Sequence, residues 1–159
     1  MIVVSDTTSL NYLIRLGFIE ILEELYERVI VPERVILEMR HAAAPTVVRE
    51  WALHPPPWLE VRTVMSPATT PRLDPGERDA IAVALEIGAD LFLTDDKKAR
   101  RAAEDLGLVV TGTLAILGAA AGRRRLDYAD TVTRLMAFGF RASEWDIEYA
   151  RPGRENRKG

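Results

Sequence analysis

Short apolar runs alternate with amphipathic stretches along this chain. Runs rich in β-branched residues predict strands at 2–4, 28–31, 90–94 and 108–111, and residues 59–64 alternate like an edge strand. Helical periodicity is found at 10–16, 18–25, 33–40, 47–53, 75–87, 97–106, 114–121, 127–138 and 143–150. Strands that alternate with helices predict an α/β fold, with a mainly parallel central sheet covered by helices on both faces.

The ends of the predicted helices carry the expected residues. Gly17, Gly88 and Gly107 each follow a helical stretch, as helix-ending glycines do. Pro32 comes directly after the second strand, and we expect it at the first position of the next helix.

Size and composition favour one domain. The chain has 159 residues, 48% of them hydrophobic, which is enough to bury a real core. Six of the nine prolines fall at 55–75, and we interpret this region as a connection inside one domain at 1–150. The basic tail at 151–159 is expected to be disordered.

Charge and residue usage narrow the function classes. The net charge of -3 gives no global basic field to attract nucleic acid. There are no cysteines, so disulfides and thiolate metal sites are excluded, and a cytoplasmic location is favoured. We expect no signal peptide, because the N-terminus has no charged region followed by a long apolar one. We expect no contact with a membrane, because the longest apolar stretch, at 114–121, is shorter than the roughly 20 residues that span a bilayer.

Acidic residues follow two of the strongest strands. Asp6 ends the first strand, and Asp95 and Asp96 end the strand at 90–94. In open α/β sheets the ligand site lies beyond the carboxyl ends of the strands, so these carboxylates are expected to converge. Glu38 and Glu77 lie on helices that can lean toward the same edge. The alternative is that Asp6 or a neighbouring hydroxyl only caps the next helix.

Glu77 is preferred to Asp79 as the inward acid of its helix. At about 100° per residue, Glu77 shares an apolar face with Ile81, Ala84 and Gly88, whereas Asp79 falls on the more polar side. A carboxylate on a buried face needs a partner, because an unpaired buried charge is costly. The other interpretation is a carboxylate near solvent that favours the helix N-terminus.

Clustered carboxylates without histidine or cysteine suit Mg²⁺ or Mn²⁺. Without a cation such carboxylates repel one another, and with one or two ions they can support hydrolysis of a phosphodiester. No phosphate-binding or dinucleotide glycine motif is present, and Gly76 and Gly112 are interpreted as isolated turn glycines.

Basic residues are available for contact with a phosphate backbone, although each group alone also fits a solvated helix face or a helix end. They are Lys97, Lys98, Arg100 and Arg101, and then Arg123, Arg124 and Arg125. Trp51, Trp58 and Trp145 are expected in the core or an interface rather than in base stacking.

The chain resembles the PIN-domain nucleases, in particular VapC-like toxins and a related prokaryotic branch of unknown function. The resemblance covers nearly the whole chain. It is carried in order by Val3–Leu10, Val31–Glu38, Gly76–Ala82, Leu93–Lys97, Val110–Leu114 and Gly139–Arg141.

This resemblance implies a three-layer α/β/α sandwich and a Mg²⁺- or Mn²⁺-dependent ribonuclease that cleaves single-stranded RNA. Asp6 and Glu38 match the first two family acids, and Asp96 matches the fourth, with Asp95 as a further metal ligand. Glu77 stands where the family usually has an aspartate, and Asp79 is the fallback. Ser9 or Thr7 would hydrogen-bond the first acid.

The resemblance also implies a homodimer and, for a type II toxin, a small antitoxin that covers the site. Two other functions remain open. One is a catalytically inactive PIN-like module that binds RNA or a partner, against which the full set of acids argues. The other is a phospho-accepting aspartate domain, which would need a lysine after a late strand, where the chain has Thr111-Gly112-Thr113.

Overall fold

The central element of the fold is one parallel sheet. The computed structural model describes residues 1–66 and 72–153. Five strands in this part of the chain form a sheet in the order β3-β2-β1-β4-β5, and every pair is parallel. The strands are β1 (Ile2–Ser5), β2 (Arg28–Pro32), β3 (Leu59–Arg62), β4 (Leu91–Leu93) and β5 (Val110–Thr111). The parallel sheet and the edge position of β3 confirm the sequence-based predictions.

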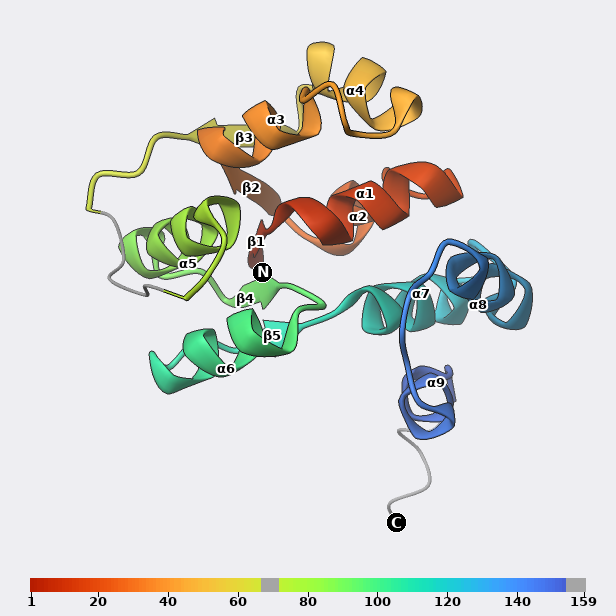
Figure 1. Cartoon of the computed structure of the whole chain (residues 1–159). Coiled ribbons are helices and arrows are strands. Elements are labelled where there is room, and N and C mark those ends of the chain that lie inside the picture. The colour runs from red at the N-terminus through yellow and green to blue at the C-terminus, as the bar shows by residue number, and fades with distance from the viewer. Residues whose placement is uncertain (67–71, 154–159) are drawn as a thin grey trace.

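Helices cover both faces of this sheet, so the fold is a three-layer α/β/α sandwich, as expected. They are α1 (Thr7–Leu16), α2 (Ile21–Leu25), α3 (Glu33–Met39), α4 (Thr46–Leu53), α5 (Pro75–Ile87), α6 (Lys97–Asp105), α7 (Thr113–Gly122), α8 (Tyr128–Ala137) and α9 (Glu144–Ala150). In Figure 1, α5 and α6 lie on one side of the strands, and α1, α7 and α8 lie on the other.

Alternating side chains of the strands supply the two cores. Val3 and Val29 face the larger core with α1, α3, α4, α7 and α8. Val4 and Ile30, the next residues of the same strands, face a smaller core built on α5 and α6. Since successive strand residues point to opposite faces, a strand that is apolar throughout needs cover on both sides.

Helix boundaries follow the residues that mark them, with one exception. Gly17 and Gly88 end α1 and α5 in the left-handed conformation, with φ of 82° and 61°. Pro32, however, does not open α3. It is the last residue of β2, paired with Arg62, and its ψ of 153° keeps it extended at the position before the helix.

The position of β1 determines where a site can form. From β1 the chain moves outward to β2 and β3, and it then returns to add β4 and β5 on the opposite side of β1. The helices that follow β1 and β4 therefore leave toward opposite faces of the sheet, since α1 joins the larger core and α6 the smaller one. Such a topological switch point is where ligands bind in open α/β sheets.

Two predicted segments lie partly outside the described residues. Residues 67–71 belong to the proline-rich connection, and 154–159 form most of the tail for which disorder is expected. Directly before residues 154–159, Arg151–Gly153 form a turn, and Arg151 forms an ion pair with Glu148 at 2.8 Å. Across 1–66 and 72–153, no helix combines the length and the apolar character that crossing a membrane requires.

Candidate functional site

Asp6 lies at the switch point, between the ends of β1 and β4. Its side chain is 1% exposed. Oδ1 accepts the backbone N–H of Ser9 at 3.1 Å, so Asp6 is the N-cap of α1. Oδ2 accepts the hydroxyl of Thr94 at 2.6 Å, across 88 residues of sequence. The capping interpretation is thus correct, but the same carboxylate is also buried and fixed to the end of β4.

Asp95 and Asp96 follow β4 and point to different partners. The Ser9 hydroxyl donates to Asp95 Oδ2 at 3.0 Å, which connects Asp95 to the loop that holds Asp6. Thr113 donates both its backbone N–H, at 2.8 Å, and its hydroxyl to Asp95. Asp96 is exposed and caps α6 by accepting the backbone N–H of Ala99 at 2.9 Å. Its own N–H donates to the Thr94 hydroxyl at 3.2 Å.

Glu38 reaches the same region from α3. Its Oε2 accepts the hydroxyl of Thr7, the residue after Asp6, and its Oε1 accepts the backbone N–H of Gly76 at 3.0 Å. A Cβ at Gly76 would overlap the Glu38 carboxylate. Gly76 lies in the first turn of α5, and its missing side chain leaves room for the Glu38 carboxylate.

Glu77 and Asp79 have different surroundings, although both begin α5. Glu77 is partly buried, and its Oε2 accepts the backbone N–H of Asp74 at 3.3 Å within a capping box. The pKa of Glu77 is raised to about 7, mainly by burial and then by the negative charges of Asp96, Asp74 and Asp6, while the hydrogen bond from the Asp74 N–H lowers it. Asp79 instead pairs with Arg34 at 3.5 Å. The negative charges of Asp6 and Asp96 therefore act on Glu77, whereas Asp79 is paired with Arg34.

The pKa of Asp6 is also shifted upward. This pKa is raised to about 6 in total, and burial is the main cause. Hydrogen bonds from Thr94 and Ser9 lower it, and the charge of Asp95 raises it again. Two carboxyl groups at one edge of the sheet therefore hold protons more tightly than isolated acids, because burial and neighbouring negative charge both disfavour ionisation.

The donor chemistry of this edge fits a hard divalent cation. Every candidate ligand is a carboxylate oxygen, and a cation would offset the repulsion between carboxylates that adds to burial in raising the pKa values of Asp6 and Glu77. Within the described residues, however, no group of three or more histidine, aspartate or glutamate side chains is arranged to hold a metal. The carboxylates are turned toward N–H and hydroxyl donors of the protein, and metal binding would require them to exchange some of these partners.

Several residues of the site were not evident from the sequence. Ser9 or Thr7 is expected to hydrogen-bond the first acid; Ser9 does so through its backbone N–H, whereas the Thr7 hydroxyl donates to Glu38. Thr94 and Thr113 hold Asp6 and Asp95 and were missed. Their one sequence signal is that each hydroxyl directly follows a strand or opens a helix at the predicted ligand edge.

Gly112 and the arginine group at 123–125 lie next to acidic residues of the chain. A Cβ at Gly112 would approach Asp95 Oδ1 to 2.9 Å, so this glycine too makes room for a carboxylate. Arg125 donates two hydrogen bonds to the Glu24 carboxylate, and Arg123 donates to the Glu24 carbonyl at 2.9 Å. These two arginines tie α7 to α2, which reduces their value as phosphate contacts.

Comparison with known proteins gives the same assignment of the fold. A sequence model for a protein family described as a PIN domain matches residues 2–150. Among solved structures, a PilT N-terminus domain protein from the hyperthermophilic archaeon Sulfolobus solfataricus P2 is similar, with a TM-score of 0.56 and 19% sequence identity. The match covers 76% of this chain and 93% of that protein. No curated protein matches the chain.

Proposed function

This chain belongs to the PIN-domain family, a family with a nuclease-type fold, and from that premise we propose that it is a metal-dependent endoribonuclease. The proposed reaction is hydrolysis of phosphodiester bonds in single-stranded RNA. The observation that carries the proposal is the electrostatic coupling at the switch point, where buried Asp6 and partly buried Glu77 have raised pKa values beside Asp95 and Asp96.

The proposed metal ligands are Asp6, Glu38, Glu77, Asp95 and Asp96. A bound Mg²⁺ or Mn²⁺ ion would supply the positive charge that activates water and stabilises charge on the phosphodiester. The protein prepares its own groups for this task. Ser9 and Thr94 orient Asp6, Thr113 fixes Asp95, and the Gly76 N–H and Thr7 hydroxyl hold Glu38.

The finer parts of the proposal rest on the family alone. They are a role as the toxin of a type II toxin–antitoxin pair in the cytoplasm, a small antitoxin partner and a homodimer.

A comparison of two isosteric variants at the start of α5 tests the ribonuclease proposal. Glu77→Gln removes a carboxylate that senses Asp6 and Asp96, whereas Asp79→Asn removes one that faces Arg34. With single-stranded RNA and Mn²⁺, we expect Glu77→Gln to lower the cleavage rate by at least about 100-fold, in the range of a lost catalytic group, and Asp79→Asn to retain it. Cleavage by the wild-type chain that survives EDTA would contradict the proposal.

A second candidate is a PIN-like module that binds RNA or a partner without cutting it. The observation in its favour is that, in the residues that the structure describes, no three or more acidic or histidine side chains are arranged to hold a metal ion. This function predicts RNA binding with no cleavage in Mn²⁺ or Mg²⁺, and no change of affinity in Glu77→Gln.

A further inference from the structure

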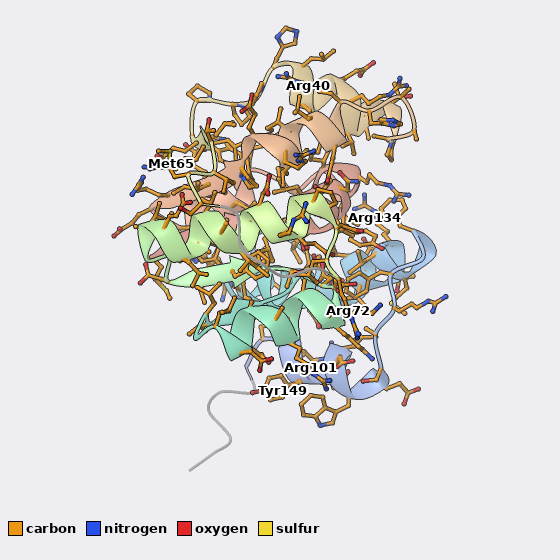
Figure 2. The ribbon with its side chains drawn as sticks, turned by 60° about the vertical axis from the view of Figure 1, so that its left-hand side comes forward. Arg40, Met65, Arg72, Arg101, Arg134 and Tyr149 are labelled. Carbon is orange, nitrogen blue, oxygen red and sulfur yellow. The ribbon has the colours of Figure 1, made fainter. Side chains whose placement is uncertain are left out.

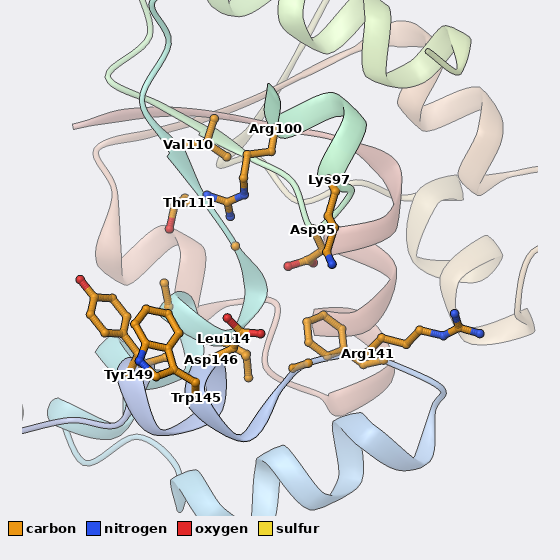
Figure 3. Close-up of a pocket in the computed structure, with 15 residues that line it drawn as sticks. Asp95, Lys97, Arg100, Val110, Thr111, Leu114, Arg141, Trp145, Asp146 and Tyr149 are labelled. Atoms are coloured by element: carbon orange, nitrogen blue, oxygen red, sulfur yellow. The ribbon is translucent and has the colours of Figure 1, made fainter. Parts of the chain in front are cut away.

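A cavity of about 500 Å³ adjoins the acidic edge. α6, β5, the start of α7, the segment 140–142 and α9 surround it, so it brings together elements that are far apart in the chain (Figure 3). Asp95 lines this cavity and also accepts the Ser9 hydroxyl beside Asp6. The cavity and the proposed catalytic edge are therefore continuous through one carboxylate.

Two aromatic side chains of α9 form one wall. Trp145 and Tyr149 are one helical turn apart, and their rings stack with centroids 4.8 Å apart and planes inclined by 15°. Each residue is 64% exposed, so Trp145 lies outside the core, which was one of the two locations expected for it beside an interface. Figure 2 shows Tyr149 at the edge of the molecule below α6. A stacked pair with this exposure leaves aromatic surface open to a ligand.

Cationic side chains line the same cavity. Lys97 and Arg100 enter it from α6, and Arg141 lies at its far end from the aromatic pair (Figure 3). The positive charges of Lys97 and Arg100 also influence Asp146 in α9. The pKa of Asp146 is lowered mainly by its hydrogen bonds with Ser143, and the charges of these two residues lower it further. Positive charge thus faces the helix that carries the rings.

We propose that this cavity is a nucleobase-stacking subsite for single-stranded RNA. An unpaired base would stack on the Trp145–Tyr149 pair, and Lys97, Arg100 and Arg141 would contact the phosphates that lead toward Asp95. Rings that stack on bases next to cations that follow the backbone are the combination that binds single strands. A duplex does not fit, because its bases are already paired and stacked. The identity of the ligand rests on the proposed ribonuclease function.

The test measures RNA binding separately from cleavage. A fluorescein-labelled single-stranded RNA of about 12 nucleotides, which spans more than one stacking site, is titrated with the full chain, and anisotropy is recorded in EDTA and again in Ca²⁺. Trp145→Ala and Tyr149→Ala are each expected to weaken binding by roughly 5- to 100-fold, the effect of losing one stacked base. Trp145→Phe keeps an aromatic face and is expected to retain most of the affinity.

Two further variants separate stacking from general surface effects. Leu53→Ala removes an apolar side chain that is 57% exposed on α4, and it is expected to leave RNA affinity unchanged. Arg141→Ala is expected to reduce the slope of log affinity against log salt by about 0.7, the value for one phosphate contact with a single strand.

The outcomes distinguish this inference from the ribonuclease proposal. Equal affinity of Trp145→Ala and the wild-type chain overturns the stacking subsite, as does a wild-type chain that binds RNA in neither buffer. Light scattering tests the alternative that the aromatic pair contacts a second copy of the chain. If Trp145→Ala converts a dimer to a monomer with unchanged RNA affinity per protomer, the aromatic pair binds a second copy and the inference is wrong. RNA binding through Trp145 without cleavage in Mn²⁺ supports the subsite and overturns only the ribonuclease proposal.

Discussion

Replacing Asp6 by asparagine is expected to stabilise the metal-free protein while it disables the site. Asp6 is 1% exposed, and its pKa is raised from 3.8 to about 6 mainly by burial. The ionised carboxylate is therefore disfavoured in the folded state relative to the unfolded chain. An asparagine has nearly the same shape, can still accept the Ser9 N–H, and carries no charge to bury.

The size of the effect follows from the pKa. A rise of about two units corresponds to about 3 kcal/mol, since each unit is worth about 1.4 kcal/mol. A raised pKa gives stability that is fully present below the unfolded value and is lost as the pH rises through the folded value. Asp6→Asn should therefore exceed the wild type by up to about 3 kcal/mol near pH 8, and the two should converge near pH 4.

Urea denaturation in EDTA at several pH values between 4 and 8 measures this difference. The exposed Asp127 provides a matched control, because it caps α8 by accepting the Asp130 N–H at 2.8 Å, much as Asp6 caps α1. Asparagine and aspartate are similar as caps, so Asp127→Asn should change stability by less than about 0.5 kcal/mol at every pH.

Added Mn²⁺ provides a second arm of the same experiment. A ligand that binds only the folded state raises its stability, so Mn²⁺ should stabilise the wild type and not Asp6→Asn. Burial does not disfavour the ionised Asp6 carboxylate if Asp6→Asn is less stable than the wild type near pH 8, or if the difference in stability between them does not change with pH.

Two further predictions concern α5. Gly76→Ala should slow cleavage and lower stability by about 1 kcal/mol, because its Cβ would overlap the end of the Glu38 side chain, which would move and lose a hydrogen bond from Thr7 or Gly76. Gly122→Ala, whose Cβ would lie 3.8 Å from its neighbour, should change urea stability by less than about 1 kcal/mol, and equal effects of the two variants would refute this account. The raised pKa of Glu77, about 7, predicts that Mn²⁺ affinity measured by calorimetry falls as the pH drops from about 8 to 6, since the metal must displace a proton; an affinity independent of pH would contradict it.

The strands and the ligand edge could be predicted because their signals are local. Ile2–Val4 is apolar on both faces, which indicates a covered parallel strand, and an acid directly after it must lie at the carboxyl edge of the sheet. The preference for Glu77 over Asp79 came from helical periodicity alone. In the structure, Asp79 pairs with Arg34, and the negative charges of Asp96 and Asp6 act on Glu77.

The hydrogen-bond partners of the acids could not be predicted in the same way. Thr94 and Thr113 reach carboxylates only because β4 and β5 pair beside β1, and no spacing in the sequence encodes that proximity. The role of Gly76 could not be predicted for the same reason. A side chain at this position would overlap Glu38 only because α3 packs closely against α5. The exposure of Trp145 could not be predicted either, because an aromatic side chain on a helix fits a core or an interface position equally well in the sequence.

The central place of the first strand determines when the acidic edge can exist. β1 leaves the ribosome before the other strands of the sheet, but the Thr94 hydroxyl that holds Asp6 belongs to a residue 88 positions after Asp6. A nascent fragment that ends before β4 lacks one whole side of the switch point. Because domains emerge from the N-terminus during synthesis, the cluster of carboxylates can form only after β4 and the residues that follow it have been made.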